Sequence, residues 1–351
     1  MSGPLLVDVG GPALDAADLE RLSHPLVGQV ILFTRNFASC DQLEALCAEI
    51  HALRDPPLLI VADHEGGRVQ RFRAGFTSVP PMADFGCLWR TDAAEACRLA
   101  RATGVVVAHE LRAHGIDMAL APVLDLDWGR SRVIGERSFG RDPWAVAQLA
   151  GALAQGYATA GMSCCGKHFP GHGWAEGDSH VAVPCDDRPL EELLREDMAP
   201  YRWLGPALGA VMPAHVVYPA VDSMPAGFSR VWLQDVLRAR VGFQGAVISD
   251  DLSMQGAEVA GPVEQRAARA LQAGCDIVTI CNDPAAVDRV LRTLRWESTP
   301  EFVSRRARLR PRGDAVFRGD LSRDAVWRAA ARDLAAWIDR APPADRGGGD
   351  R

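Results

Sequence analysis

The sequence predicts an α/β fold, a single (β/α)8 barrel of the TIM type whose strands can be irregular. Short apolar runs recur along the 351 residues, and each is followed by a longer helical pattern. About eight such units fit within roughly the first 280 residues, as a barrel of this kind requires. An open doubly wound sheet is the alternative, although no GxGxxG motif follows the first run to indicate a dinucleotide site.

The apolar runs are bounded by turn signals, which is typical of strands that are buried on both faces. They occupy residues 5–9, 27–33, 57–62, 117–123, 162–167, 208–213, 246–249 and 276–280.

The segments between these runs have the pattern of amphipathic helices. Residues 143–160 are rich in Ala and Leu, with Asp142 as N-cap, Pro143 at the first helical position and Gly161 as the stop. Residues 93–114 behave in the same way and end at Gly115.

Further helices are expected after the last strand, at residues 284–294, 300–308 and 324–340, packed on the barrel exterior. We therefore predict one catalytic barrel domain over residues 1–340. Residues 341–351 consist mainly of Pro, Gly and charged residues and predict a disordered tail.

Composition excludes several classes of partner. With 38 Lys and Arg against 45 Asp and Glu, the net charge is −7, which argues against a binder of nucleic acid or anionic membranes. No apolar run is long enough for a membrane span. The N-terminus has no secretory pattern, and the nine cysteines are scattered without a CxxC pair. We expect free thiols, a cytoplasmic location and a monomer.

Ionisable residues follow five consecutive apolar runs, where the strands of a barrel would end. The C-terminal ends of barrel strands face one rim, and active sites lie there. A single Asp at such a place commonly caps a helix, but ionisable residues from five strand ends that meet at one rim predict a catalytic site. The residues are Asp63, His64, Glu65, Arg68, Arg71, Asp125, Asp127, Glu136, Arg137, Lys167, His168, His172, Asp178, His180, His215, Asp250 and Asp251.

These residue types favour chemistry on a small polar substrate such as a sugar. Asp250 directly follows an apolar run, and a carboxylate fixed there can attack a carbon centre and form an ester. Its neighbour Asp251 would point the other way and cap the next helix. Asp178 and His180 lie two apart in a glycine-rich loop, where the carboxylate can hold one ring nitrogen and leave the other as acid or base.

Binding groups complete this set. Lys167, Arg71 and Arg137 are hydrogen-bond donors only, suited to hydroxyls, carbonyls or carboxylates. Asp63 is an acceptor suited to a pair of sugar hydroxyls.

Five segments together resemble glycoside hydrolase family 3 and, within it, the single-domain bacterial members that act in peptidoglycan recycling. The similarity extends over about residues 4–340, and the combination of the third and fourth segments is the most specific. The segments are Ile31-Leu32-Phe33-Thr34-Arg35-Asn36, Asp63-x-Glu65-Gly66-Gly67-Arg68-Val69-Gln70-Arg71, Lys167-His168-Phe169-Pro170-Gly171-His172-Gly173, Asp178-Ser179-His180 and Ser249-Asp250-Asp251-Leu252-Ser253-Met254.

The resemblance implies a retaining, two-step hydrolysis of terminal β-linked N-acetylglucosamine from muropeptide fragments that carry 1,6-anhydro-N-acetylmuramic acid. It implies Asp250 as nucleophile, His180 as general acid/base and Asp178 as its partner. Asp63, Arg71, Arg137, Lys167 and His168 match the positions that bind the sugar. No cofactor and no metal ion are implied. Trp174 departs from the family pattern and either stacks on substrate or packs on the rim.

Four other functions are consistent with parts of this pattern. The His and Asp residues include zinc-ligand types, although no HxH or HExxH signature is present. A phosphorylase would keep the fold and replace water with phosphate. A substrate-assisted hexosaminidase would use an Asp-Glu pair, where this chain has Asp250-Asp251. A sugar-binding barrel without catalysis is the fourth.

Overall fold

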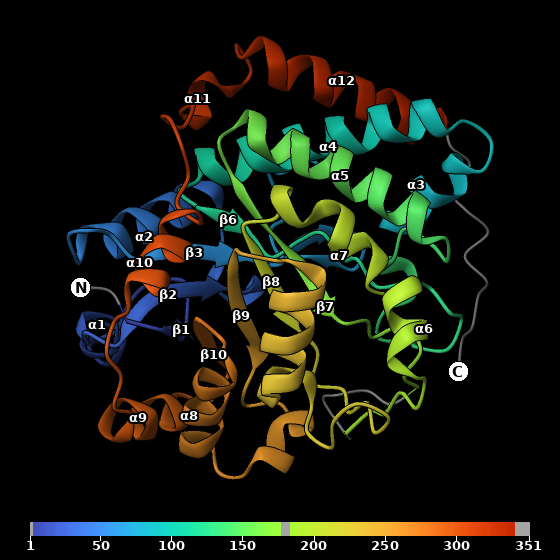
Figure 1. The fold of residues 1–351 in the computed structure, drawn as a ribbon. Coiled ribbons are helices and arrows are strands. Elements are labelled where there is room, and N and C mark those ends of the chain that lie inside the picture. The colour runs from blue at the N-terminus through green and yellow to red at the C-terminus, as the bar shows by residue number, and fades with distance from the viewer. Residues whose placement is uncertain (1–2, 177–182, 341–351) are drawn as a thin grey trace, which may run out of the picture.

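A closed barrel of eight parallel strands forms the centre of the molecule, as the sequence predicts (Figure 1). The computed structural model describes residues 3–176 and 183–340. The barrel closes where the first and last strands pair in parallel, with Leu5 opposite Val278. The open-sheet alternative is therefore excluded.

Each predicted apolar run overlaps one barrel strand, and β7 and β9 continue two residues beyond their runs. In their order around the barrel, the strands are β1 (Leu5–Asp8), β2 (Val27–Leu32), β3 (Leu59–Ala62), β6 (Met118–Ala119), β7 (Ser163–Phe169), β8 (Ala210–Pro213), β9 (Ala246–Asp251) and β10 (Ile277–Ile280). The regular part of β6 is shorter than its run because Pro122 follows and has no N–H for the ladder. A short hairpin of β4 (His64–Gly66) and β5 (Val69–Gln70) follows β3.

Both faces of the strands are buried. Along β1, Leu5 and Val7 pack outward into the large core between barrel and helices, while Leu6 belongs to the cluster inside the barrel. In β9, Val247 faces outward and Ile248 inward. This alternation follows from the period of two along a strand, and it explains why the strands have continuous apolar sequences.

Helices surround the barrel, and two of them match the detailed sequence expectations. Asp142 caps α5 by accepting a hydrogen bond from the Trp144 N–H at 3.1 Å, and Gly161 after its end has a positive φ of 68°. The α-helices are α1 (Ala16–Ser23), α2 (Cys40–Ala52), α3 (Met82–Trp89), α4 (Ala93–Ala113), α5 (Pro143–Thr159), α6 (Leu190–Arg195), α7 (Ala199–Leu204), α8 (Val263–Ala273), α9 (Pro284–Thr293), α10 (Pro300–Ala307), α11 (Arg318–Leu321) and α12 (Ala325–Arg340).

Shorter or wider turns complete the connections. The segment η5 (Val231–Val241) is π-helical and takes the place of a crossover helix between β8 and β9. The 3₁₀ turns are η1 (Thr34–Asn36), η2 (Gly135–Arg137), η3 (Gly205–Ala207), η4 (Ala226–Phe228) and η6 (Gln255–Ala260).

The C-terminal helices do two different things. As expected, α12 packs on the outside, along α4, through Ala330 and Leu334 (Figure 1). The expectation of exterior packing is wrong for the segment around α10, because Phe302 and Leu309 enter the apolar cluster inside the barrel. They cover the barrel at the end where the strands begin, so the apolar side chains inside the barrel near that end are shielded from water.

Across residues 3–176 and 183–340, no helix combines the length and apolarity needed to cross a bilayer.

Leu309→Ala should lower the free energy of unfolding by about 2–5 kcal/mol, because Leu309 is fully buried and its truncation leaves a cavity. Val303→Ala on the neighbouring α10 is the matched control, since Val303 is 58% exposed and should lose less than about 0.5 kcal/mol. Urea unfolding of the three proteins measures both values. Equal losses would show that the segment does not close the barrel.

Candidate active site

A cavity of about 670 Å³ opens at the C-terminal ends of the barrel strands. Six of the eight predicted site residues line it: Asp63, Arg71, Arg137, Lys167, His168 and Asp250. The other two, Asp178 and His180, lie outside the described residues. The barrel thus brings together side chains that are up to 187 residues apart in the chain, since 250 − 63 = 187.

Asp63 connects two cations on the cavity wall. It follows β3, and its Oδ1 accepts a hydrogen bond from the Lys167 Nζ at 2.7 Å, while Oδ2 accepts one from the Arg71 Nη2 at 2.8 Å. Burial raises the pKa of Asp63, but the charges of Lys167 and Arg71 outweigh it and hold that pKa well below its usual range. Asp63 is therefore an ionised acceptor.

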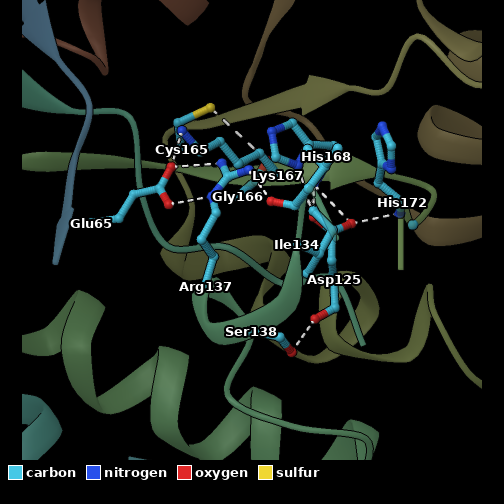
Figure 2. A network of polar contacts seen from close by, with 12 residues as sticks. Glu65, Asp125, Ile134, Arg137, Ser138, Cys165, Gly166, Lys167, His168 and His172 are labelled. Carbon is cyan, nitrogen blue, oxygen red and sulfur yellow. Dashed lines mark hydrogen bonds and ion pairs between the residues drawn. The ribbon is translucent and has the colours of Figure 1, made fainter. Parts of the chain in front are cut away.

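Glu65 is the second carboxylate of this wall, and the sequence motifs assign it no role. Its Oε2 and Oε1 accept hydrogen bonds from Arg137 Nε and Nη2 at 2.7 and 2.8 Å, and Oε1 lies 2.7 Å from Lys167 Nζ (Figure 2). Burial raises the pKa of Glu65, but Arg137 and Lys167 lower it to about 2. The available signal was the D-x-E spacing, which places alternate residues of an extended chain on one side.

Lys167 is therefore held between two carboxylates. Its side chain is 3% exposed, and burial alone would lower its pKa. The charges of Asp63 and Glu65 raise the pKa instead, so the ammonium stays protonated. A buried lysine of this kind requires such partners, because an unpaired charge costs several kcal/mol to bury.

A third carboxylate, the fully buried Asp125, positions the histidines. Its Oδ2 lies 2.7 Å from His168 Nδ1, and its oxygens accept the backbone N–H groups of His168 and His172 (Figure 2). Charge and hydrogen bonds from His168 overcome the burial that would raise the pKa of Asp125, and lower it. The bond to Nδ1 fixes the orientation of the His168 ring at the cavity. Asp125 was noted as a rim residue, but its positioning role was missed.

Asp250 lies near the end of β9 and lines the same cavity as Asp63 and Lys167. Its Oδ1 accepts a hydrogen bond from the backbone N–H of Asp251 at 2.8 Å. Burial raises its pKa, but the nearby His215 and His168 and this backbone N–H lower it overall. The result is an ionised carboxylate at the centre of the rim, which is the state that a nucleophile requires.

Asp251 differs from the expectation of a helix cap. Its carboxylate accepts hydrogen bonds from Ser253 N and Oγ at 3.0 and 2.6 Å and from Cys281 N at 3.1 Å. The following turn, η6, begins four residues later and has no side-chain cap. Asp251 therefore ties the end of β9 to the end of β10 and keeps the backbone at Asp250 in place.

Trp174 packs on the rim. Its ring meets Trp128 edge to face, with centroids 4.9 Å apart, and the guanidinium groups of Arg130 and Arg188 lie over it at 4.2 and 4.6 Å. Trp174 does not line the cavity. Of its two predicted roles, packing is the one that these contacts support.

Within the part of the chain that the structure describes, no group of three or more His, Cys, Asp or Glu side chains is arranged to hold a metal ion. His168 is engaged by Asp125, and His215 Nε2 lies 3.0 Å from the Asp251 carbonyl.

Comparison with known proteins shows which sequences and folds this chain is similar to. Residues 5–309 match the family model described as the glycosyl hydrolase family 3 N-terminal domain. A β-hexosaminidase of Aromatoleum aromaticum is 54% identical over 338 residues, which are 96% of this chain and 95% of that protein.

Solved structures show the same fold. NagZ from Neisseria gonorrhoeae in complex with N-trifluoroacetyl-D-glucosamine superposes with a TM-score of 0.90 and 46% identity, covering 95% of this chain and 98% of that one. A second structure of the Neisseria protein, in complex with zinc ion, gives a TM-score of 0.89 at 44% identity, again over 95% and 98% of the two chains.

Glu65→Gln should lower the free energy of unfolding at pH 7 by roughly 3–5 kcal/mol, because it leaves Arg137 and Lys167 with one carboxylate fewer in a buried site. The pKa of Glu65 is about 2 in the fold against a reference of 4.5, so its stabilisation is complete above about pH 4.5 and is lost as the pH falls toward 2. The difference in the free energy of unfolding between wild type and variant should therefore become smaller as the pH falls from 4.5 toward 2.

Urea unfolding at several pH values between 3 and 7 measures this difference. Glu258→Gln is the control, since Glu258 is exposed, and its difference from wild type should stay near zero. A Glu65→Gln difference that is independent of pH would contradict the assigned ion pairs.

Proposed function

Since the chain belongs to glycoside hydrolase family 3, we propose that it is a retaining exo-β-N-acetylglucosaminidase. The proposed substrates are peptidoglycan fragments in which N-acetylglucosamine is linked to 1,6-anhydro-N-acetylmuramic acid, with or without a peptide. One observation carries this proposal: the ionised Asp250 shares a cavity with the paired groups Asp63, Lys167 and Arg71.

The wall of paired charges suits the hydroxyls of one terminal sugar. Each oxygen of Asp63 accepts one hydrogen bond from a cation and retains a lone pair for a hydroxyl. The Nε of Arg71 is buried without a partner among the described residues, so it is available as a donor. His168 presents its Nε2 while Asp125 holds Nδ1. Fixed donors and acceptors of this kind select a substrate by its hydroxyl pattern.

In the first proposed step, a carboxylate oxygen of Asp250 attacks the anomeric carbon from one face. The glycosidic bond breaks, and the leaving oxygen takes a proton from His180, with Asp178 holding the other ring nitrogen. The product is a covalent glycosyl ester on Asp250. The roles of His180 and Asp178 rest on the family resemblance.

In the second step, water attacks the same carbon and breaks the ester. His180, now neutral, takes the proton of that water as general base, and Asp250 returns to its carboxylate form. Two inversions give net retention. An imidazole has an unperturbed pKa near 6.5, which suits transfer in both directions near neutral pH.

The substrate class is supported by the relatives. The matched proteins are named β-hexosaminidases, and the Neisseria structure holds an N-acylated glucosamine. The proposal includes a monomeric enzyme that acts on recycled wall fragments in the cytoplasm, with consequences for cell-wall biogenesis, cell shape and division.

Asp250→Ala should reduce turnover of an aryl N-acetyl-β-glucosaminide by at least about a thousandfold, because the covalent step loses its nucleophile. Release of the aryl alcohol measures this, with the matching aryl glucoside as a specificity control. A slow fluorinated substrate should add one glycosyl mass to the peptide containing Asp250. A variant that retains full turnover would contradict the nucleophile assignment.

The reaction products show whether water or phosphate accepts the glycosyl group. In phosphate buffer the proposed hydrolase should release free N-acetylglucosamine, whereas accumulation of the glycosyl phosphate would show a phosphorylase.

His180→Ala should reduce kcat/KM by about 10²–10⁴-fold on substrates with a sugar leaving group, which need protonation. The loss should be much smaller on activated aryl glycosides, whose leaving groups depart as anions. Measuring both substrates on one enzyme preparation removes differences in folding. Equal losses on the two would contradict the acid role.

A further inference from the structure

A second cavity, of about 630 Å³, lies at the opposite end of the barrel from the active site. It is bordered by the residues that precede or begin three strands: Ser163 of β7, Gly209 before β8 and Gly245 before β9. Four arginines line it, Arg202, Arg308, Arg310 and Arg312, and the described lining residues include no Asp or Glu. Four cations without a carboxylate are unusual in a chain whose net charge is −7.

Most of these guanidinium groups are free to bind a ligand. The side chains of Arg202, Arg308 and Arg312 are exposed and make no hydrogen bond or ion pair with the described residues. Arg310 donates one hydrogen bond, to the Pro57 carbonyl at 2.8 Å, and keeps its other donors. The charge of Arg310 also acts on a neighbouring side chain. Burial, together with the charges of Arg310 and Arg54, lowers the pKa of Arg306 to about 10.

Compensation of helix C-termini accounts for the place of only two of the four arginines, Arg202 in the last turn of α7 and Arg308 at the C-cap of α10. Arg310 and Arg312 lie beyond the end of α10. The helices end at this side of the barrel, and cations near a C-terminus can satisfy its carbonyls. At the end of α5, Arg112 already does so by donating to the Ala160 carbonyl, and the other carbonyls that Arg112 and Arg238 bind lie in loops. Arg112 donates to the carbonyls of Ala160, Arg312 and Gly313, and Arg238 donates to those of Phe243 and Gly245.

We propose that this cavity binds a small polyanion with two or more phosphate groups. Guanidinium groups bind phosphate through paired, charge-assisted hydrogen bonds. The volume lies within the range of about 300–1,000 Å³ for small-molecule sites. Met162, Leu208 and Val241 form an apolar part of the lining, which an organic group attached to the phosphates would contact.

Titration calorimetry with sodium triphosphate, ATP and citrate tests the site, at low salt and again at 150 mM NaCl. Wild type should bind about one triphosphate per chain, with affinity that falls as salt rises. Tighter binding of ATP would identify a nucleotide as the ligand, and equal binding would identify the inorganic anion. Citrate should bind at least about tenfold more weakly.

The double variant Arg308→Gln/Arg312→Gln should weaken triphosphate binding at least about tenfold, because each lost group made charge-assisted bonds. Arg328→Gln on α12 is the control: Arg328 is exposed and outside the cavity lining, and its variant should bind as wild type does. Far-ultraviolet circular dichroism should show all three proteins equally folded.

Three results would overturn the proposal. They are the absence of saturable binding by either phosphate compound, binding that survives in the double variant, and citrate binding as tight as that of triphosphate.

Discussion

The buried ammonium of Lys167 is the constraint on which the active-site wall depends. It lies within 2.7 Å of both Asp63 and Glu65, and those carboxylates in turn hold Arg71 and Arg137. Removing Asp63 takes the carboxylate from Arg71, and removing Glu65 takes it from the largely buried Arg137, where an unpaired charge costs several kcal/mol. The five side chains therefore act as a unit. Their geometry is fixed before a substrate arrives, which avoids reorganisation during binding.

Positioning in this site depends on two carboxylates that have no proposed part in the reaction, the buried Asp125 and the half-buried Asp251. Asp125 holds two backbone N–H groups and one imidazole, and Asp251 ties the end of β9 to the end of β10. Both carboxylates act on neighbours of the proposed reacting groups. The barrel supplies the rigid strands, and these acidic side chains fix the short irregular segments that leave them. Preorganisation of this kind is what the proposed two-step displacement at one carbon needs.

The two ends of the barrel differ in electrostatics as well as in form. At the C-terminal ends of the strands, cations are matched by Asp63 and Glu65, so the hydroxyls of the proposed substrate would meet paired donors and acceptors. At the other end, the segment around α10 closes the interior with Phe302 and Leu309, while three arginines of residues 308–312 face a cavity without carboxylates. One segment therefore seals the core and carries the charges of the proposed anion site.

The sequence by itself determined the barrel and the places of most candidate site residues around the cavity. Apolar runs with strand length predicted all eight strands, since burial on both faces leaves a local pattern, and Asp142, Pro143 and Gly161 located the ends of α5. Rim residues such as Asp63, Lys167 and Asp250 followed from their places after those runs. Only the tertiary structure decided which charges pair, that Glu65 and Asp125 position the others, and that Phe302 enters the barrel. These pairings and packing contacts join segments that are far apart in the chain, and a local sequence pattern does not indicate which distant segments meet.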